Sequence, residues 1–467
     1  MQFDYQFTPD SSRIIFRAHQ ERPFDNTNLF SVEPDGSKLV QLSNITGAGH
    51  RISDFKISPD SRIVVYRGEQ DDEGVTELYG VRADGTASPY KLSRDDNTGS
   101  QEIYDYAINL DSKDVAFRVS DSDNDPIALF SVPLDGGVPT RISASLPPAG
   151  DVYRFQFTPN GRSVVYQAAQ TALPPYDLFA VSVLGGEVTP LGSELRDVIS
   201  LHSFQIGSDG EHVVFQTIDL DTTHQDLFSV QLNGEKLVQL DEPVDERVTQ
   251  YEITPNGRSV VYIAGSGFGN PYELFNIAID GDERRQLSQG ADNTVHVNFF
   301  DLAEDGETIV YRSSVGEKAL YSVQRNGEKL QQLIAVTADE SISDVAIAPN
   351  NSTVFYEIRN NRTSQGILHR QLLDSGQPEP IPFDYLPNES ILYYLFAPDS
   401  SYVLFTTTLT LDGKKPIYLT QDDGQGGAGE TPPDGLQRLP ADLTGVEPDG
   451  PFQFPVLSAN GRYLAFP

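Results

Sequence analysis

Hydrophobic and polar positions follow one pattern that recurs ten times along this chain. A short apolar segment leads into a polar turn that reads Pro-Asp-Gly or a near variant. A second apolar segment follows and ends in an aromatic residue, as in FTPDSSRIIF and FTPNGRSVVY. The acid or amide of the turn falls at Asp10, Asp60, Asp111, Asn160, Asp209, Asn256, Asp305, Asn350, Asp399 and Asn460. Successive turns are 45 to 51 residues apart until the last step, which is 61, and a regular period of this length indicates a repeat architecture.

Each repeat predicts four β-strands. The two segments that flank the turn are the first two, and a third begins with Leu, an aromatic residue, any residue and Val, as at Leu29–Val32. An Asp-Gly or Asn-Gly pair such as Asp35-Gly36 then suits a two-residue hairpin, because both residues tolerate positive φ. A short fourth segment ends in Leu or Ile, as at Leu42. No segment shows sustained helical periodicity, so the pattern predicts an all-β protein.

Four antiparallel strands in a period of about 49 residues are typical of one blade of a β-propeller. One small sheet cannot bury both of its faces alone, so neighbouring blades must stack face to face. We expect these interfaces to be filled by the aromatic residues that close the second strands, namely Phe16, Tyr66, Phe117, Tyr166, Phe215, Tyr262, Tyr311, Tyr356 and Phe405. Burial of one such side chain contributes roughly 1.5–3 kcal/mol.

The repeat resembles the TolB-type propeller repeat, which also forms the propellers of prolyl-oligopeptidase-like and dipeptidyl-peptidase-like enzymes. The motif that carries the resemblance is Pro-Asp-Gly, an apolar strand, Leu-Tyr/Phe-x-Val and Asp-Gly-Gly, and it is most complete from Leu129 to Gly137. The resemblance covers essentially the whole chain. It implies the fold but not one function, because such propellers serve as scaffolds, partner-binding domains and enzyme gates.

Nine repeats have all four strands, and the tenth stops after its second strand at Phe466-Pro467. Propellers commonly have four to eight blades. Residues 1–467 are therefore expected to form either one unusually large propeller or a fragment of a longer multi-propeller protein, and the abrupt ends favour the fragment. A flexible Gly- and Pro-rich insertion within residues 421–451 accounts for the longer final spacing.

Composition narrows the classes of partner. Lys and Arg number 33 and Asp and Glu 68, which gives a formal charge of −35. This charge argues against a nucleic-acid surface, which needs a basic patch, and against docking on anionic membranes. The chain has no Cys, and no apolar run is long enough to span a membrane. We expect a bacterial protein of the periplasm, the cell surface or the medium, whose export signal lies upstream of this chain.

The loops that join strands two and three, and those that lead from strand four to the next repeat, are the longer and more variable ones. Loops on a rigid scaffold commonly carry binding sites. Acidic residues gather in them, and we single out Asp71, Asp72, Glu73, Asp95, Asp96, Asp245 and Glu246 as a partner-binding face. The alternative is that these loops are acidic simply because loops are polar.

Asp121, Asp123 and Asp125 have the alternating-oxygen spacing of a hard-cation loop. The segment is not a helix-loop-helix calcium loop, because Pro126 stands where that loop needs Gly and Val132 where it needs Glu. Calcium held in a simpler loop is one hypothesis, and a solvated acidic turn is the other. No other cofactor is expected.

Catalytic signatures are sparse. There is no Gly-x-Ser-x-Gly nucleophile elbow, and His50, His202 and His296 lie in loops that lead into first strands without partners at motif spacing. The leading hypothesis is a non-enzymatic scaffold that presents an acidic, loop-rich face to a protein or other ligand. One alternative is the propeller gate of a serine peptidase whose catalytic domain is absent. The other is a metal-dependent polysaccharide lyase, in which these histidines would hold the metal. The oligomeric state is not indicated.

Overall fold

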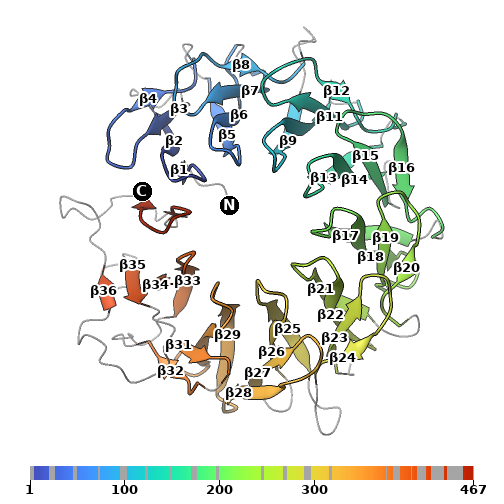
Figure 1. The fold of residues 1–467 in the computed structure, drawn as a ribbon, viewed down its shortest axis with the longest axis vertical. Coiled ribbons are helices and arrows are strands. Elements are labelled where there is room, and N and C mark those ends of the chain that lie inside the picture. The colour runs from blue at the N-terminus through green and yellow to red at the C-terminus, as the bar shows by residue number, and fades with distance from the viewer. Residues whose placement is uncertain are drawn as a thin grey trace. The chain divides into compact units, whose positions relative to one another are not determined.

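The computed structural model describes residues 5–19, 27–45, 50–71, 74–94, 102–120, 125–147, 150–169, 176–195, 199–242, 247–266, 271–288, 296–314, 318–374, 376–381, 390–400, 402–407, 417–421, 436–438 and 456–465 (Figure 1). These residues form an all-β structure of nine four-stranded antiparallel sheets and one two-stranded sheet, without a helix. Each four-stranded sheet is one blade of a β-propeller, as the repeat predicts. None of the described residues belongs to a helix long and apolar enough to cross a membrane.

The chain divides into two compact units, of which the first comprises Met1–Val238 and Phe454–Phe466. It holds the first five blades and the C-terminal hairpin. The strands are β1 (Tyr5–Phe7), β2 (Ile14–His19), β3 (Thr27–Val32), β4 (Val40–Gln41), β5 (Ile52–Ile57), β6 (Ile63–Gly68), β7 (Glu77–Arg82), β8 (Tyr90–Lys91), β9 (Glu102–Ile108), β10 (Asp114–Ser120), β11 (Ala128–Pro133), β12 (Thr140–Arg141), β13 (Val152–Phe157), β14 (Ser163–Ala169), β15 (Tyr176–Ser182), β16 (Val188–Leu191), β17 (Ile199–Ile206), β18 (His212–Asp219), β19 (Leu227–Gln231), β20 (Val238–Gln239), β37 (Val456–Leu457) and β38 (Leu464–Ala465).

The second unit comprises Gln239–Gln453 and holds blades six to nine. Its strands are β21 (Arg247–Ile253), β22 (Ser259–Gly265), β23 (Glu273–Ala278), β24 (Arg285–Gln286), β25 (Val297–Leu302), β26 (Thr308–Ser313), β27 (Ala319–Gln324), β28 (Gln331–Ala335), β29 (Glu340–Ile347), β30 (Thr353–Asn360), β31 (Gly366–Leu372), β32 (Glu379–Pro380), β33 (Ile391–Phe396), β34 (Tyr402–Thr407), β35 (Ile417–Gln421) and β36 (Leu436–Arg438). The boundary falls inside β20, so that Val238 belongs to the first unit and Gln239 to the second.

Aromatic residues at the end of the second strands fill the contacts between blades, as predicted. Tyr66, Phe117, Tyr166 and Phe215 are fully buried in the first unit. Most stack on the aromatic residue opposite them on the third strand, as Tyr66 does on Tyr79 with ring centroids 5.3 Å apart. Such pairs join burial of a large apolar surface to a favourable ring geometry.

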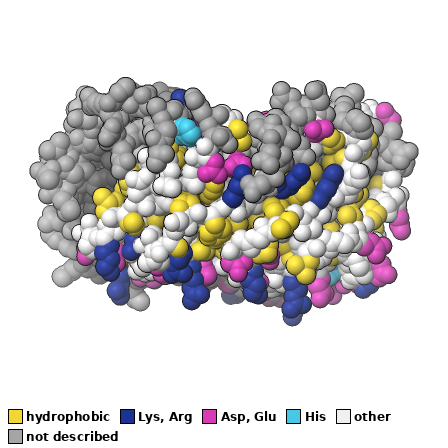
Figure 2. Space-filling model, turned by 90° about the horizontal axis from the view of Figure 1, so that it is seen from above, with side chains coloured by type: hydrophobic (Ala, Val, Ile, Leu, Met, Phe, Trp, Pro, Cys, Tyr) yellow, Lys and Arg dark blue, Asp and Glu magenta, His cyan; other side chains and the backbone are white. Residues whose placement is uncertain are grey.

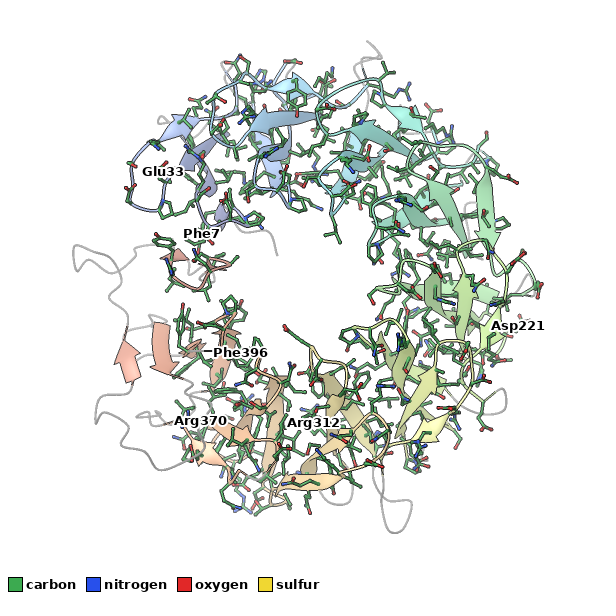
Figure 3. All side chains as sticks on the ribbon, in the orientation of Figure 1. Phe7, Glu33, Asp221, Arg312, Arg370 and Phe396 are labelled. Atoms are coloured by element: carbon green, nitrogen blue, oxygen red, sulfur yellow. The ribbon has the colours of Figure 1, made fainter. Side chains whose placement is uncertain are left out.

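Phe16 is the exception, because it is only half-buried. The first blade is flanked on that side by the two-stranded C-terminal hairpin, which has too few strands to cover a whole blade face. The hairpin nevertheless packs against β1: the ring centroids of Phe7 and Tyr463 are 6.3 Å apart, and Asn460 N donates to Ser11 Oγ at 3.3 Å (Figure 3).

The turns between first and second strands are joined from blade to blade. The residue after the turn acid or amide has positive φ, and where it is Ser or Asn its side chain accepts a hydrogen bond from the backbone N–H of the preceding turn. These bonds link Asp10 to Ser61, Asp60 to Ser112, Asp305 to Asn351 and Asn350 to Ser400. Neighbouring turns within each unit therefore lie at the same end of their blades.

Arginines on the second strands also form hydrogen bonds to the next blade. Arg17, Arg67 and Arg118 each donate from Nη1 to a backbone carbonyl at the β-bulge in the first strand of the next blade, at Ile52, Ile103 and Val152, over 2.8–2.9 Å. A bulge leaves carbonyls outside the ladder, and the guanidinium supplies donors for them. In the second unit, Arg312 reaches Ile342 O in the same way at 2.6 Å (Figure 3).

Candidate metal centre

The acidic residues that the sequence singles out fall into two groups. Asp72, Glu73, Asp95, Asp96, Asp245 and Glu246 lie outside the described residues, as do Asp121 and Asp123 of the expected calcium loop. Asp71 and Asp125 are described, and both are exposed. The acidic face and the calcium loop stay predictions at these positions.

Asp71 lies close to the stacked pair Tyr66–Tyr79 of the second blade. Burial raises the pKa of the Tyr66 hydroxyl, and the charge of Asp71 raises it further. Tyr79 donates to Glu77 Oε2 at 2.8 Å, and Lys91 forms an ion pair with the same carboxylate. Lys91 balances the charge of Glu77, and Tyr79 hydrogen-bonds to it. We therefore interpret this network as part of the packing of the blade and not as a binding site.

The three histidines of the lyase alternative each contact their own surroundings. His50 Nδ1 lies 2.6 Å from Glu69 O, and His202 is an exposed side chain at the bulge of β17. His296 packs edge-on against Tyr272, with ring centroids 5.2 Å apart. Among the described residues, one group of three side chains could hold a metal ion, and it contains none of these histidines.

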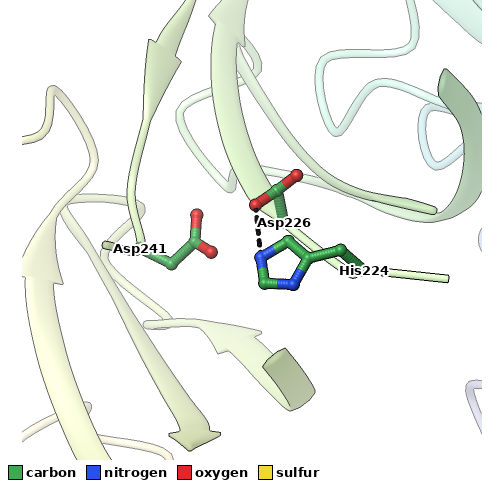
Figure 4. A group of neighbouring side chains, drawn as sticks. All are labelled: His224, Asp226 and Asp241. Atoms are coloured by element: carbon green, nitrogen blue, oxygen red, sulfur yellow. Dashed lines mark ion pairs between the residues drawn. The ribbon is translucent and has the colours of Figure 1, made fainter. Parts of the chain in front are cut away.

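That group contains His224 and Asp226, which follow β18 in the first unit, and Asp241, which belongs to the second unit (Figure 4). His224 Nε2 and Asp226 Oδ1 are 3.1 Å apart, and the two side chains are 27% and 14% exposed. Asp241 is more deeply buried, at 6%.

Local hydrogen bonds fix the loop that carries His224. Asp219, the last residue of β18, accepts at Oδ1 from the backbone N–H groups of Asp221 and Thr222, at 2.9 Å each. Its own N–H donates to His224 O at 2.9 Å, and Thr223 between them has a φ of 60°. The carboxylate thus satisfies two backbone donors of the turn, so the turn presents His224 from a defined backbone.

The sequence analysis missed this group because its members come from two separate loops. His224 and Asp226 follow β18, while Asp241 follows β20. A signal was nevertheless present in the repeat. The residue after the Leu or Ile that ends strand four is Ser43, Ser93, Ser143 and Ser288 in four other blades, and Asp241 is acidic in their place.

The end of the blades that carries the tight turns has both basic and acidic side chains on its surface. Figure 2 shows Lys and Arg side chains along the lower edge of the view, with acidic side chains among them. Local ion pairs at the tight turns match this distribution, joining Lys38 to Glu33, Arg82 to Asp84 and Lys113 to Asp111. Arg82 in turn holds the pKa of Asp84 far below its usual range. At each of these three turns an acidic residue is therefore paired with a basic residue close to it in the sequence.

No known family profile matches the sequence, and no curated protein matches it. Solved structures do match. Dipeptidyl peptidase 4 from Porphyromonas gingivalis has a TM-score of 0.51 and 10% identity, over 90% of this chain and 64% of that one. Prolyl oligopeptidase B from Galerina marginata has a TM-score of 0.40 and 13% identity, over 80% of this chain and 56% of that one. This chain thus spans less than two thirds of either peptidase, and the likeness is one of fold.

Proposed function

We propose that this chain is a non-enzymatic propeller scaffold that binds a cationic protein or other cationic ligand through the loop end of its blades. The observation that carries the proposal is the difference between the two ends. Hydrogen bonds between successive turns, such as Asp60 N to Ser112 Oγ at 3.0 Å, tie one end together. Local ion pairs such as Lys113 with Asp111 balance individual acids at that end, while the chain as a whole carries a formal charge of −35.

The loop end has the features that binding needs. Its loops are longer, they stand on a rigid sheet scaffold, and they carry exposed acids such as Asp71, Asp125 and Asp221. An acidic surface of this kind steers a basic partner by long-range attraction and orients it. A location outside the cytoplasm and a TolB-type repeat are further parts of this proposal, and they rest on the sequence pattern.

Two triple variants of equal charge test the proposal. One neutralises loop-end acids (Asp71→Asn, Asp125→Asn, Asp221→Asn), and its matched control neutralises exposed acids at the tight turns (Asp35→Asn, Asp135→Asn, Glu235→Gln). The probe is a fluorescent oligolysine peptide, titrated at low and physiological salt. We expect the loop-end variant to bind it at least threefold more weakly than the control variant does. Equal weakening would show that charge acts without regard to position and would overturn the proposal.

A second candidate is the propeller part of a larger hydrolase. It is favoured by the match of 90% of this chain to 64% of the Porphyromonas gingivalis peptidase. The test is the complete reading frame together with an assay of the protein that it encodes. An adjoining domain with a Gly-x-Ser-x-Gly elbow and turnover of a peptide substrate would establish this candidate, because acyl transfer needs a nucleophile, a base and an oxyanion site.

A further inference from the structure

One face of the first blade is less well covered than the same face of the blades that follow it. In blades two to five, two residues of the second strand and the Val of the third strand form this face, and all of them are buried. They are Val64, Tyr66 and Val81, then Val115, Phe117 and Val132, then Val164, Tyr166 and Val181, and then Val213, Phe215 and Val230. The corresponding residues of the first blade are Ile14, Phe16 and Val32, and these are only half-buried.

The preceding blade covers this face elsewhere in the first unit. In the second blade, Tyr66 belongs to one hydrophobic cluster with Leu29 of the first blade's third strand and with Leu42, which follows its fourth strand. Leu78 and Leu92 of the second blade cover the third blade in the same way. The cover therefore comes from a third and a fourth strand.

The hairpin β37–β38 lies beside the first blade and belongs to the same compact unit (Figure 1). The ring of Tyr463 lies next to that of Phe7, and Asn460 N donates to Ser11 Oγ. The hairpin corresponds to the first and second strands of a blade, and β38 pairs only with β37 among the strands that the structure describes. Within the described residues it therefore brings no third or fourth strand to the first blade.

The open edge of β38 has backbone groups in position to receive a further strand. Ser458 N donates to Tyr463 O at 2.9 Å, so these two residues form a hydrogen-bonded pair. Pairs alternate along an antiparallel ladder, so the N–H and C=O of the next residue, Leu464, point away from β37. In the second blade, the corresponding residue, Val64, lies opposite Val81 of the third strand. An edge of this kind binds an extended segment through main-chain hydrogen bonds.

We propose that this surface binds a β-hairpin of another polypeptide, which adds a third and a fourth strand to β37–β38 and covers the apolar face of the first blade. Its strand next to β38 carries Leu, an aromatic residue, any residue and Val, and a second Leu follows the first after about as many residues as separate Leu29 from Leu42. A second copy of this chain is not the expected occupant, because each described third strand already lies inside a four-stranded sheet.

Two physical effects favour this association. The added strands remove apolar surface of the first blade and of the partner from water. Two strands alone are at best marginally stable in water, whereas three or more with an apolar face are stable. The partner is therefore expected to stabilise the C-terminal hairpin together with the first blade. This surface is separate from the acidic loop end, and neither proposal depends on the other.

A synthetic copy of this chain's own third and fourth strands tests the proposal. The probe is a fluorescent peptide of residues 27–43, which contains Leu29 and Leu42. It is titrated against the whole protein and followed by fluorescence anisotropy. The control peptide has the same length and charge and carries Leu29→Asn and Leu42→Asn. We expect one probe peptide to bind per chain and to raise the melting temperature, and the control peptide to bind more weakly by roughly tenfold or more.

Two variants of the protein locate the surface. Leu464→Pro removes the N–H that points to the open edge and keeps the hydrogen bonds to β37, since Pro is tolerated on an edge strand. Its matched control is Leu464→Ala, which keeps this N–H. Phe16→Asn makes the half-buried face polar. We expect Leu464→Pro and Phe16→Asn each to weaken probe binding by roughly tenfold, and Leu464→Ala to stay within about threefold of the wild type.

Circular dichroism shows whether each variant is folded, and Leu464→Pro decides the test if Phe16→Asn is not. Three results would overturn the proposal. They are the absence of probe binding by the wild type, equal binding of the two peptides, and a loss in Leu464→Pro no greater than that in Leu464→Ala. A wild-type dimer that forms without peptide and is lost in Leu464→Pro would also overturn it, because it would assign the edge to a second copy of this chain.

Discussion

Ser61 Oγ accepts a hydrogen bond from the backbone N–H of Asp10 at 2.9 Å, across the contact between the first two blades. Ser61 has a φ of 66°, in the left-handed region that residues other than Gly rarely adopt. The corresponding residue is Gly161 in the fourth blade and Gly210 in the fifth. At Ser61 the interblade hydrogen bond offsets backbone strain that Gly avoids.

This relationship predicts an unusual order of stability. Ser61→Ala loses the hydrogen bond and keeps the strain, so we expect a loss of about 1 kcal/mol. Ser61→Gly loses the same bond but relieves strain of about 1–2 kcal/mol, which offsets most of the loss. Urea denaturation of the two variants and the wild type measures the difference. A Gly variant that is less stable than the Ala variant would contradict this explanation.

The tie between Arg67 and Asp54 should be far stronger than a surface ion pair. Arg67 Nη2 lies 2.5 Å from Asp54 Oδ2, and Asp54 is 5% exposed. Arg67→Ala leaves this carboxylate buried without its cation, so we expect a loss of about 3 kcal/mol. Adding Asp54→Asn to this variant should recover part of the loss, as a double-mutant cycle measures.

The control for this prediction is Arg62→Ala. Arg62 is 76% exposed and lies 4.0 Å from Asp60. Its removal should cost less than about 0.5 kcal/mol, because exposed pairs contribute little. Equal losses for Arg62→Ala and Arg67→Ala would show that the buried pair of Arg67 with Asp54 contributes no more than an exposed pair.

His369 should make the protein less stable in mild acid. It takes the aromatic position of the third strand in the eighth blade and stacks on Tyr356, with ring centroids 5.7 Å apart. Burial lowers the pKa of His369 below its usual 6.5, while its Nδ1 contact with Ile367 O and the charge of Glu340 oppose the shift. Because the unfolded chain binds the proton more readily, stability falls as the pH drops below about 6.5.

His369→Phe keeps the stacking and removes the titration. We therefore expect its melting temperature to change less than that of the wild type between pH 7 and pH 5. Parallel profiles for the two proteins would place the acid sensitivity elsewhere.

Glu252 should have the opposite dependence on pH. Burial and the nearby charge of Asp301 both raise the pKa of Glu252 above its usual 4.5. A raised acid pKa means that the folded state holds the proton more tightly, so stability is greatest in acid and falls as the pH rises above about 4.5. Glu252→Gln should raise the melting temperature at pH 7 and leave it unchanged near pH 4.

Gln is the suitable replacement because Gln6, Gln156 and Gln205 stand at the corresponding position of other blades. Thermal unfolding of both proteins at the two pH values decides the prediction. A variant that is less stable than the wild type at pH 7 would show that the charged carboxylate makes a favourable contact.

Periodicity in the sequence was enough to predict the blades. Alternating apolar residues, Asp-Gly turns and an aromatic residue at the end of each second strand are local signals, and each recurs often enough to exclude chance. The nine four-stranded sheets and the burial of Tyr66, Tyr166 and Tyr262 follow from them. Phe16 was expected to be buried with the others, and it is not, because its cover depends on a hairpin more than 400 residues away.

Contacts between blades were decided by the tertiary structure. The hydrogen bonds from Asp10 N to Ser61 Oγ and from Arg67 Nη1 to Ile103 O join residues that no short motif contains. A repeat specifies what every blade shares, since each blade must bury the same faces. A residue that departs from the repeat gains its chemical meaning only from the side chains that folding places beside it.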